Sequence, residues 1–237
     1  MLMRFGIVGR RPDMSAEAFR QYWRNVHGPL AAAIPSVRRY YQNLVISDKS
    51  FRIEIPPGSW HPDGFSQIWF DDEAAMHAAL AAPAYAANAA DIPTFIGDFK
   101  LLVCTPKVGV ELAAAGLLRK RVSLLTRRPG ISAEAFRDEW LGRHAEIVRN
   151  IPAIAGYTQN LVIHRGPDPD ENLPYTALPI DGVAELWFRS TDELREGLYS
   201  PAGEALVVHA KGFLGQVTTF EVEVYPVVDK PIRPKAG

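Results

Sequence analysis

Hydrophobic positions in the first half of the chain switch between the spacing of strands and that of helices. Residues 3–9 alternate loosely, as a strand does, and end at Arg-Arg-Pro. Ser15 then offers an N-cap oxygen, and five apolar residues follow on one helical stripe: Phe19, Tyr22, Trp23, Val26 and Leu30. We expect this helix to end after His27, because proline in Gly28-Pro29 disfavours helical geometry in the residue before it.

Further strands and a second helix complete the pattern. Strands are expected at 37–46, 65–70 and around 100–105, and a Pro- and Gly-rich loop precedes the second of these. The second helix begins at Asp71-Asp72 and breaks at Pro83. The order strand, helix, strand, strand, helix, strand is the split βαβ arrangement of the ferredoxin-like fold.

The whole pattern occurs twice in the chain. The segment from Arg10 to His27 returns from Arg127 to His144, and Tyr40-x-Gln42-Asn43 returns as Tyr157-x-Gln159-Asn160. So long a period exceeds the ~20–50 residues of solenoid and propeller repeats. We therefore predict an α+β protein of two tandem ferredoxin-like (βαββαβ) repeats that close into an intrachain dimeric α+β barrel. Its parts are residues 1–108, a linker at 109–117, residues 118–228 and a loose tail at 229–237.

Strand alternation predicts a mixed inner face for this barrel. Ile68 and Phe70 suit the helix side, which turns Gln67 and Trp69, and in the second repeat Glu185 and Trp187, to the opposite side. A polar residue beside a tryptophan is typical of a small-molecule pocket, and equally of a satisfied interface hydrogen bond.

Composition narrows the classes of partner. A net charge of -1 without a dense basic patch gives no reason to expect nucleic acid or a membrane surface. The single Cys104 excludes an intramolecular disulfide and multi-cysteine metal motifs. No signal peptide or apolar run of ~20 residues is visible, so a cytoplasmic location is expected. Glycine-rich phosphate loops and nucleophile elbows are also missing from the sequence.

The segment Tyr22-Trp23-Arg24-Asn25-x-His27-Gly28-Pro29-Leu30, followed by Ile34-Pro35 and Tyr40-x-Gln42-Asn43, resembles the EthD domain family of dimeric α+β barrel proteins. The resemblance covers nearly the whole chain, and the second copy keeps only the histidine of His-Gly-Pro-Leu. It implies a ligand cavity between helices and sheet or in the barrel mouth. Relatives and fold neighbours include cofactor-free cyclases, decarboxylases and isomerases, quinone-forming monooxygenases and haem-binding branches. Many relatives carry a histidine after Gln-Asn, where this chain has Leu44 and Leu161.

The candidates for chemistry follow from the duplication. His27 and His144 are retained in both copies, and a neutral imidazole beside a cavity can act as a general base. The structural alternative to catalysis is that each histidine side chain hydrogen-bonds the backbone at a helix end. Tyr40 can donate to developing negative charge, while Asn43 and Asn160 point to the opposite face and can orient a substrate there. Ordinary strand hydrogen bonding explains these residues equally well. His61 and His164 are placed in long loops, with no metal-ligand spacing.

The sequence favours a cofactor-independent lyase or isomerase for a hydrophobic, aromatic or polyketide-like small molecule. In this hypothesis His27 is the general base, and Gln67, Glu185 or Tyr40 orients the substrate. No cofactor or metal is expected, and the fused pair is a candidate for further homodimerisation. A non-catalytic ligand-binding protein is the main alternative, and a haem or oxygen-using oxidoreductase is the weaker one.

Overall fold

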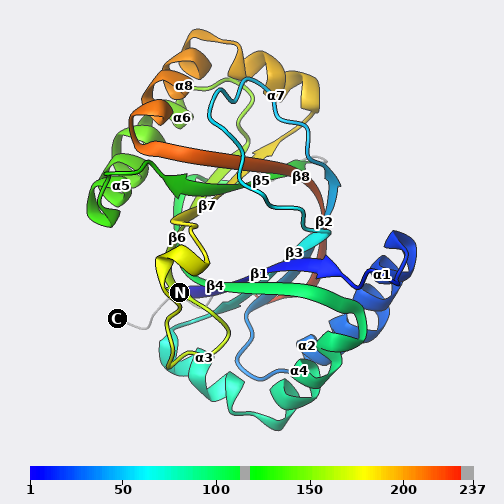
Figure 1. Cartoon of the computed structure of the whole chain (residues 1–237). Coiled ribbons are helices and arrows are strands. Elements are labelled where there is room, and N and C mark those ends of the chain that lie inside the picture. Colours follow the sequence, from blue (N-terminus) through cyan, green and yellow to red (C-terminus); the bar gives the residue numbers. More distant parts are fainter. Residues whose placement is uncertain (113–117, 231–237) are drawn as a thin grey trace.

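Within residues 1–112 and 118–230, the part of the chain that the computed structural model describes, eight strands close into one antiparallel barrel (Figure 1). Its order is β1-β3-β2-β8-β5-β7-β6-β4. The strands of the first repeat are β1 (Leu2–Arg10), β2 (Arg39–Ser47), β3 (Gly64–Phe70) and β4 (Ile96–Val110). Those of the second are β5 (Arg119–Arg127), β6 (Gly156–Arg165), β7 (Gly182–Phe188) and β8 (Leu214–Asp229). This arrangement confirms the predicted fold class.

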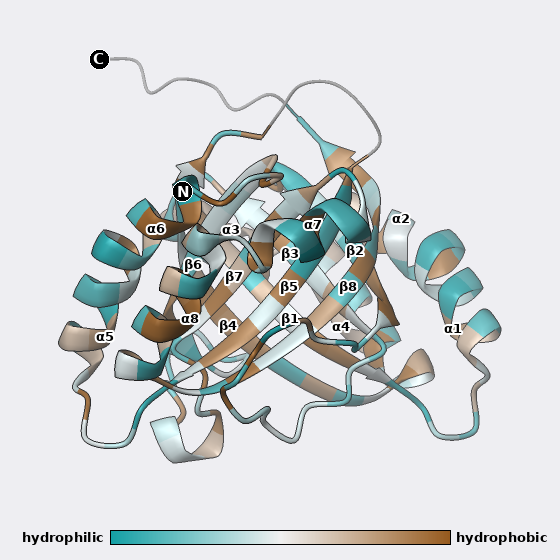
Figure 2. Cartoon of the chain, turned by 90° about the horizontal axis from the view of Figure 1, so that it is seen from above, coloured by the Kyte–Doolittle hydropathy of each residue, from teal (hydrophilic) through white to brown (hydrophobic). Residues whose placement is uncertain are grey.

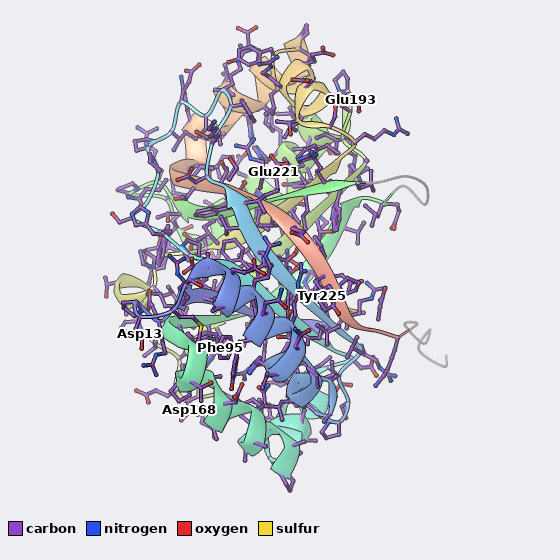
Figure 3. All side chains as sticks on the ribbon, turned by 90° about the vertical axis from the view of Figure 1, so that its right-hand side faces the viewer. Asp13, Phe95, Asp168, Glu193, Glu221 and Tyr225 are labelled. Atoms are coloured by element: carbon purple, nitrogen blue, oxygen red, sulfur yellow. The ribbon has the colours of Figure 1, made fainter. Side chains whose placement is uncertain are left out.

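The two longest strands join the repeats. β4 pairs with β1 of its own repeat and then with β6 of the second, while β8 pairs with β5 and then with β2. Figure 3 shows β8 running from one helical layer toward the other, with Glu221 and Tyr225 along it. The barrel is therefore one continuous ladder with no free edge between the repeats.

Helices cover the two outer faces of the barrel (Figures 1 and 2). The first layer holds α1 (Ala16–Tyr22), the π-helical turn η1 (Trp23–His27), α2 (Gly28–Ala32), α3 (Glu73–Leu80) and α4 (Pro83–Phe95). The second holds α5 (Ala133–Glu139), the π-helical turn η2 (Trp140–His144), α6 (Ala145–Arg149), α7 (Thr191–Leu198) and α8 (Pro201–Phe213). A short 3-10 helix, η3 (Tyr175–Ala177), precedes β7.

Strand alternation divides the core as the sequence predicts. Phe65 and Trp69 pack inside the barrel, whereas Ile68 and Phe70 pack against the first helical layer. The buried Trp23 and Trp140 occupy the same place between sheet and helices in the two repeats. Cys104 is buried inside the barrel among apolar residues, where a free thiol packs as a small hydrophobe.

The loop after the second strand of each repeat crosses to the other repeat. Residues 48–63 reach the second helical layer, where Pro56 accepts a backbone hydrogen bond from Val217 at 3.0 Å. The corresponding loop after β6 returns to the first repeat, where Gly166 donates to the backbone oxygen of Leu101 at 2.8 Å. Each repeat is thus partly closed by its neighbour.

The first long helix does not end at His27, so that expectation was wrong. Gly28 is helical, with φ -53° and ψ -54°, and it begins α2 with Pro29 in the first turn. Glycine has no Cβ to clash with the following proline ring, which lowers the penalty that the prediction assumed. The π-helical turn η1 leads directly into α2, so His27 lies inside a continuous helix rather than at its end.

Three further expectations need correction. A separate helix, α4, follows Pro83, where the sequence had suggested only a break before the last strand. β4 extends from Ile96 to Val110, well beyond 100–105. His164 lies on β6 rather than in a loop. The proposed linker at 109–117 and tail at 229–237 fall mostly outside the described residues. No helix in the described ranges is long and apolar enough to span a membrane.

Candidate functional site

His27 lies in η1, where the helix widens by one residue per turn. π-helical turns of this kind are frequent at functional sites. The same turn recurs at His144 in η2. In each repeat it directs the imidazole toward the space between the helical layer and the sheet, where both rings are buried.

Two side chains of α4 hold the His27 ring. Nδ1 lies 2.8 Å from Oδ2 of Asp91, and Nε2 lies 3.2 Å from Nδ2 of Asn88. Because the Asn88 amide nitrogen can only donate, Nε2 accepts and Nδ1 carries the proton toward Asp91. The ring also packs on Phe95, with centroids 4.8 Å apart. The arrangement fixes one tautomer, with Nε2 as the basic atom.

Electrostatics keep His27 neutral and Asp91 ionised. Burial lowers the pKa of His27, although the hydrogen bond and charge of Asp91 oppose this. Burial works to raise the pKa of Asp91, but hydrogen bonds from Tyr22 and His27 outweigh it, and the pKa is lowered. Tyr22 donates its hydroxyl to Asp91 at 2.6 Å. A neutral imidazole backed by a carboxylate is suited to accept a proton.

An enclosed cavity of about 50 Å³, the first cavity, adjoins His27. Polar side chains from both layers line it: Arg4, Tyr40, Ser66, Tyr85 and Asn88. The Tyr40 hydroxyl accepts hydrogen bonds from Trp23 Nε1 at 3.1 Å and from Gln42 Nε2 at 3.2 Å. Its own proton is therefore left to donate, and burial raises the pKa of Tyr40 to about 12. Tyr40 can thus stabilise an oxyanion without losing its proton.

Arg4 brings a positive charge to the first cavity. Its side chain is buried, and Nη2 lies 3.4 Å from the Tyr85 hydroxyl and 3.3 Å from the backbone oxygen of Pro167. No carboxylate of the described residues forms an ion pair with it. Burial lowers the pKa of Arg4. A guanidinium in this setting is suited to an anionic ligand group.

His144 has different partners from His27. Its Nδ1 lies 3.3 Å from Nδ1 of His209, which occupies the place of Asp91 in the second repeat. His209 in turn lies 3.1 Å from Glu139. Burial, with the charge of His209, lowers the pKa of His144 to about 3. So weak a base is poorly suited to proton abstraction near neutral pH.

The predicted substrate-binding residues gather elsewhere, inside the barrel. Gln67 and Glu185 are bonded to each other, Nε2 to Oε1 at 2.6 Å, and each contacts an asparagine, Asn43 at 3.1 Å and Asn160 at 2.7 Å. Between them lies Lys120, whose Nζ is 2.6 Å from Glu185 and 2.6 Å from Gln67. Trp69 and Trp187 line a depression at one barrel end together with Asn160 and Glu185.

The sheet separates these residues from His27. The hypothesis that Gln67 or Glu185 orients a substrate for His27 was therefore wrong, because they lie on the opposite face. Tyr40 alone of the proposed orienting residues shares the cavity with His27. Across the described ranges, no group of three or more His, Cys, Asp or Glu side chains is placed to hold a metal ion.

Sequence reasoning missed Arg4, Asn88, Asp91 and Lys120. Asn88 and Asp91 lie on α4, which was not predicted, and Arg4 and Lys120 lie on the strands β1 and β5, where nothing in the sequence marks them as functional. One signal was available for Asp91. When the repeats are aligned with Phe95 matched to Phe213, Asp91 and His209 occupy matching positions. Because both matched positions carry titratable side chains, Asp91 and His209 are candidate partners of the retained histidines His27 and His144.

The comparisons agree with the fold and with the duplication. The EthD domain model matches residues 11–98 and 128–216. The 4-carboxymethyl-4-methylbutenolide mutase of Pseudomonas reinekei is 31% identical over 101 residues, which is 42% of this chain and 92% of the mutase. Two solved structures share the fold. A protein of Lactobacillus acidophilus, provisionally assigned as a monooxygenase, gives a TM-score of 0.61 at 10% identity over 98% of this chain and 97% of its own. An anthrone oxidase-like protein gives 0.60 at 9% identity over 98% and 95%.

Proposed function

The chain belongs to the EthD domain family, and from that premise we propose that it is a cofactor-independent acid–base isomerase of a small unsaturated carboxylate, with His27 as the proton carrier. The observation that carries this proposal is the Asp91–His27 pair beside the enclosed first cavity. The mutase of similar sequence supports the isomerase class over a lyase.

The residues of the first cavity divide the chemistry among them. Nε2 of His27 removes a proton from a carbon next to a carbonyl group, and Asp91 stabilises the imidazolium that results. Tyr40 donates its hydroxyl proton as a hydrogen bond to the enolate oxygen. In a lactone the enolate then expels the ring oxygen, and the ligand's other carboxylate adds to the resulting double bond to close a new ring. His27 returns the proton to a carbon next to the freed carboxylate, so that atoms and charge balance over the cycle. A substrate must displace the Asn88 amide from Nε2 to begin.

Arg4 indicates the substrate class. Its buried guanidinium, without a carboxylate partner among the described residues, matches one carboxylate of the ligand. The name of the related mutase describes a compound with a carboxymethyl group on a butenolide ring. We therefore propose a lactone or related unsaturated acid, a smaller and more polar substrate than the aromatic or polyketide-like molecule that the sequence suggested.

The test is turnover of 4-carboxymethyl-4-methylbutenolide and its ring-substitution isomers, followed by NMR. His27→Gln should lower kcat/KM by about 100-fold or more, within the range expected for a general base. The matched control is His144→Gln, which alters the equivalent histidine and should retain turnover. Equal losses in the two variants, each with an unchanged circular dichroism spectrum, would contradict the assignment.

A further inference from the structure

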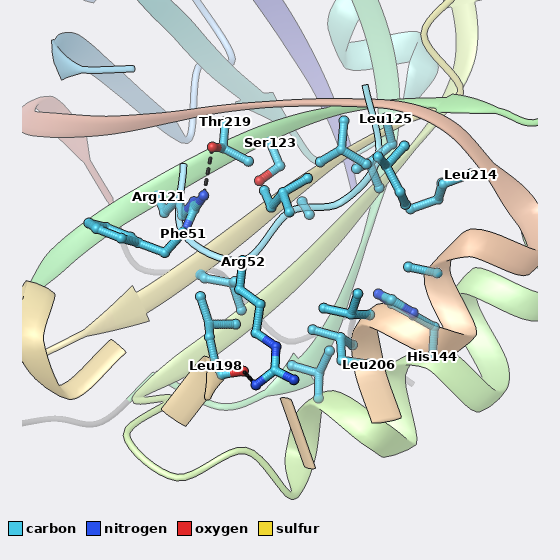
Figure 4. Close-up of a pocket in the computed structure, with 18 of the residues that line it drawn as sticks. Phe51, Arg52, Arg121, Ser123, Leu125, His144, Leu198, Leu206, Leu214 and Thr219 are labelled. Atoms are coloured by element: carbon cyan, nitrogen blue, oxygen red, sulfur yellow. Dashed lines mark hydrogen bonds between the residues drawn. The ribbon is translucent and has the colours of Figure 1, made fainter. Parts of the chain in front are cut away.

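The second repeat has its own cavity, the second cavity, of about 100 Å³ (Figure 4). It lies between the sheet and the helices α6 and α8, and the loop residues 51–55 of the first repeat close it. Most of its lining is apolar, including Leu125, Trp140, Val148, Leu206, Ala210 and Leu214. Such a lining suits the hydrophobic body of a small ligand.

Two arginines line this cavity, Arg52 and Arg121, and Arg121 is the more deeply buried of the two. Arg121 is 4% exposed, and its guanidinium makes one hydrogen bond, from Nη2 to Thr219 Oγ1 at 2.6 Å (Figure 4). No carboxylate in the described ranges lies within 4.0 Å of it, and Glu221 on the neighbouring strand is paired with Arg119 at 2.6 Å. A guanidinium has five N–H donors, and a buried charge without a partner is costly. Glu221, opposite Arg121 on β8, acts on it as a charge from beyond 4.0 Å, and the guanidinium keeps N–H donors for an anionic ligand group in the cavity.

The groups around Arg121 favour a carboxylate over a larger anion. Ser123 and Thr219 place hydroxyl groups in the lining. Phe51 packs beside the guanidinium, 5.9 Å from ring centroid to Cζ. Arg–carboxylate pairs are planar and frequently bidentate, which suits a narrow site.

We propose that the second cavity binds a small monocarboxylate with a hydrophobic body, its carboxylate on Arg121 and its body against the side chains of α6 and α8. This site differs from the first cavity in function, because His144 faces His209 rather than a carboxylate. It is a binding site without a proton carrier. The proposal is independent of the reaction assigned to His27.

Benzoate is the probe, with benzamide as its uncharged counterpart, and binding to the full chain is measured by isothermal titration calorimetry. Titrations use the Arg4→Met background, which removes the cation of the first cavity. Benzoate should bind to the Arg4→Met protein with a stoichiometry of one, in the second cavity. Benzamide should bind at least about tenfold more weakly. Adding Arg121→Met should abolish benzoate binding.

A second variant tests the same site in case the Arg121→Met protein does not fold. Leu206→Trp fills the body of the cavity without altering Arg121 and should also abolish binding. Absence of benzoate binding in the Arg4→Met background would overturn the proposal, as would binding that survives both further changes. Neither result bears on turnover at His27, which the His27→Gln variant tests separately.

Discussion

A carboxylate partner is the difference between the two histidines that the duplication preserves. His27 faces Asp91, whereas His144 faces His209. The retained histidines were predictable from the repeated motif, but their partners were not, because those lie more than sixty positions away on helices with little amphipathic pattern. Sequence alone therefore identified the candidate bases and favoured His27, but it did not reveal the carboxylate that distinguishes the two.

Asp91→Asn tests the partner of His27 through the pH dependence of kcat/KM. Burial lowers the pKa of His27 and Asp91 opposes this, so the substitution should lower that pKa further. Rate should be constant above about pH 6.5 in the parent chain and fall as His27 becomes protonated. In the variant the acid limb should move to lower pH, with a plateau about 10- to 100-fold lower. An unchanged profile would show that Asp91 does not act on His27.

The helices and strands show how far periodicity reaches. Phe19, Tyr22 and Trp23 of the apolar stripe and the alternation around Gln67 were predicted correctly, because burial on one face leaves a direct trace in the sequence. Val26 of the same stripe is 43% exposed, since it lies in the π-helical turn, where the helical period changes. α4 was missed since it begins and nearly ends with proline and is rich in alanine, so it has no clear stripe. Gly28-Pro29 misled because the rule for residues before proline assumes a Cβ.

Each buried tryptophan of the π-helical turns packs on a glycine at the start of a strand. A Cβ on Gly182 would lie 2.3 Å from the Trp140 ring, and one on Gly64 would lie 2.5 Å from Trp23. This contact explains why both repeats keep glycine there. It also sets how closely the helix that carries the histidine approaches the sheet.

Gly182→Ala should therefore destabilise the protein by about 1–3 kcal/mol, the usual cost of overpacking a filled core. The measurement is urea unfolding followed by fluorescence. Gly212→Ala is the matched control, since nothing lies within 4 Å of a Cβ there. Alanine in that helix should raise the free energy of unfolding by up to about 1 kcal/mol. Similar effects of the two changes would contradict the packing argument.

At the scale of the whole molecule, the fused repeats have lost symmetry at the centre of the barrel. The ion pair of Lys120 and Glu185 has Met3 and Gln67 at the matching places of the first repeat. Lys120 also donates to Asn43 at 3.1 Å, so one charge serves both repeats, and Oδ1 of Asn160 is left without a partner. Glu185 and Gln67 were predicted to face inward. The sequence did not predict an inward-facing Lys120, because this residue lies between two arginines at the start of a strand.

Lys120→Met leaves Glu185 buried without its partner and should destabilise the chain by about 3–5 kcal/mol. Adding Glu185→Gln gives the second repeat the Met and Gln that the first repeat has at Met3 and Gln67. The double variant should recover a free energy of unfolding within about 1 kcal/mol of the parent. Chemical denaturation of the three proteins measures this. A double variant as unstable as the single one would show that the charges are needed for more than their mutual pairing.

The most direct test of the central claim, that His27 is the proton carrier, is deuterium incorporation into 4-carboxymethyl-4-methylbutenolide in heavy water, followed by proton NMR. Exchange reports proton abstraction even when no isomer accumulates. We predict exchange with the parent chain and with His144→Gln, at a carbon next to a carbonyl group, and none with His27→Gln. Undiminished exchange with a folded His27→Gln protein would contradict the account.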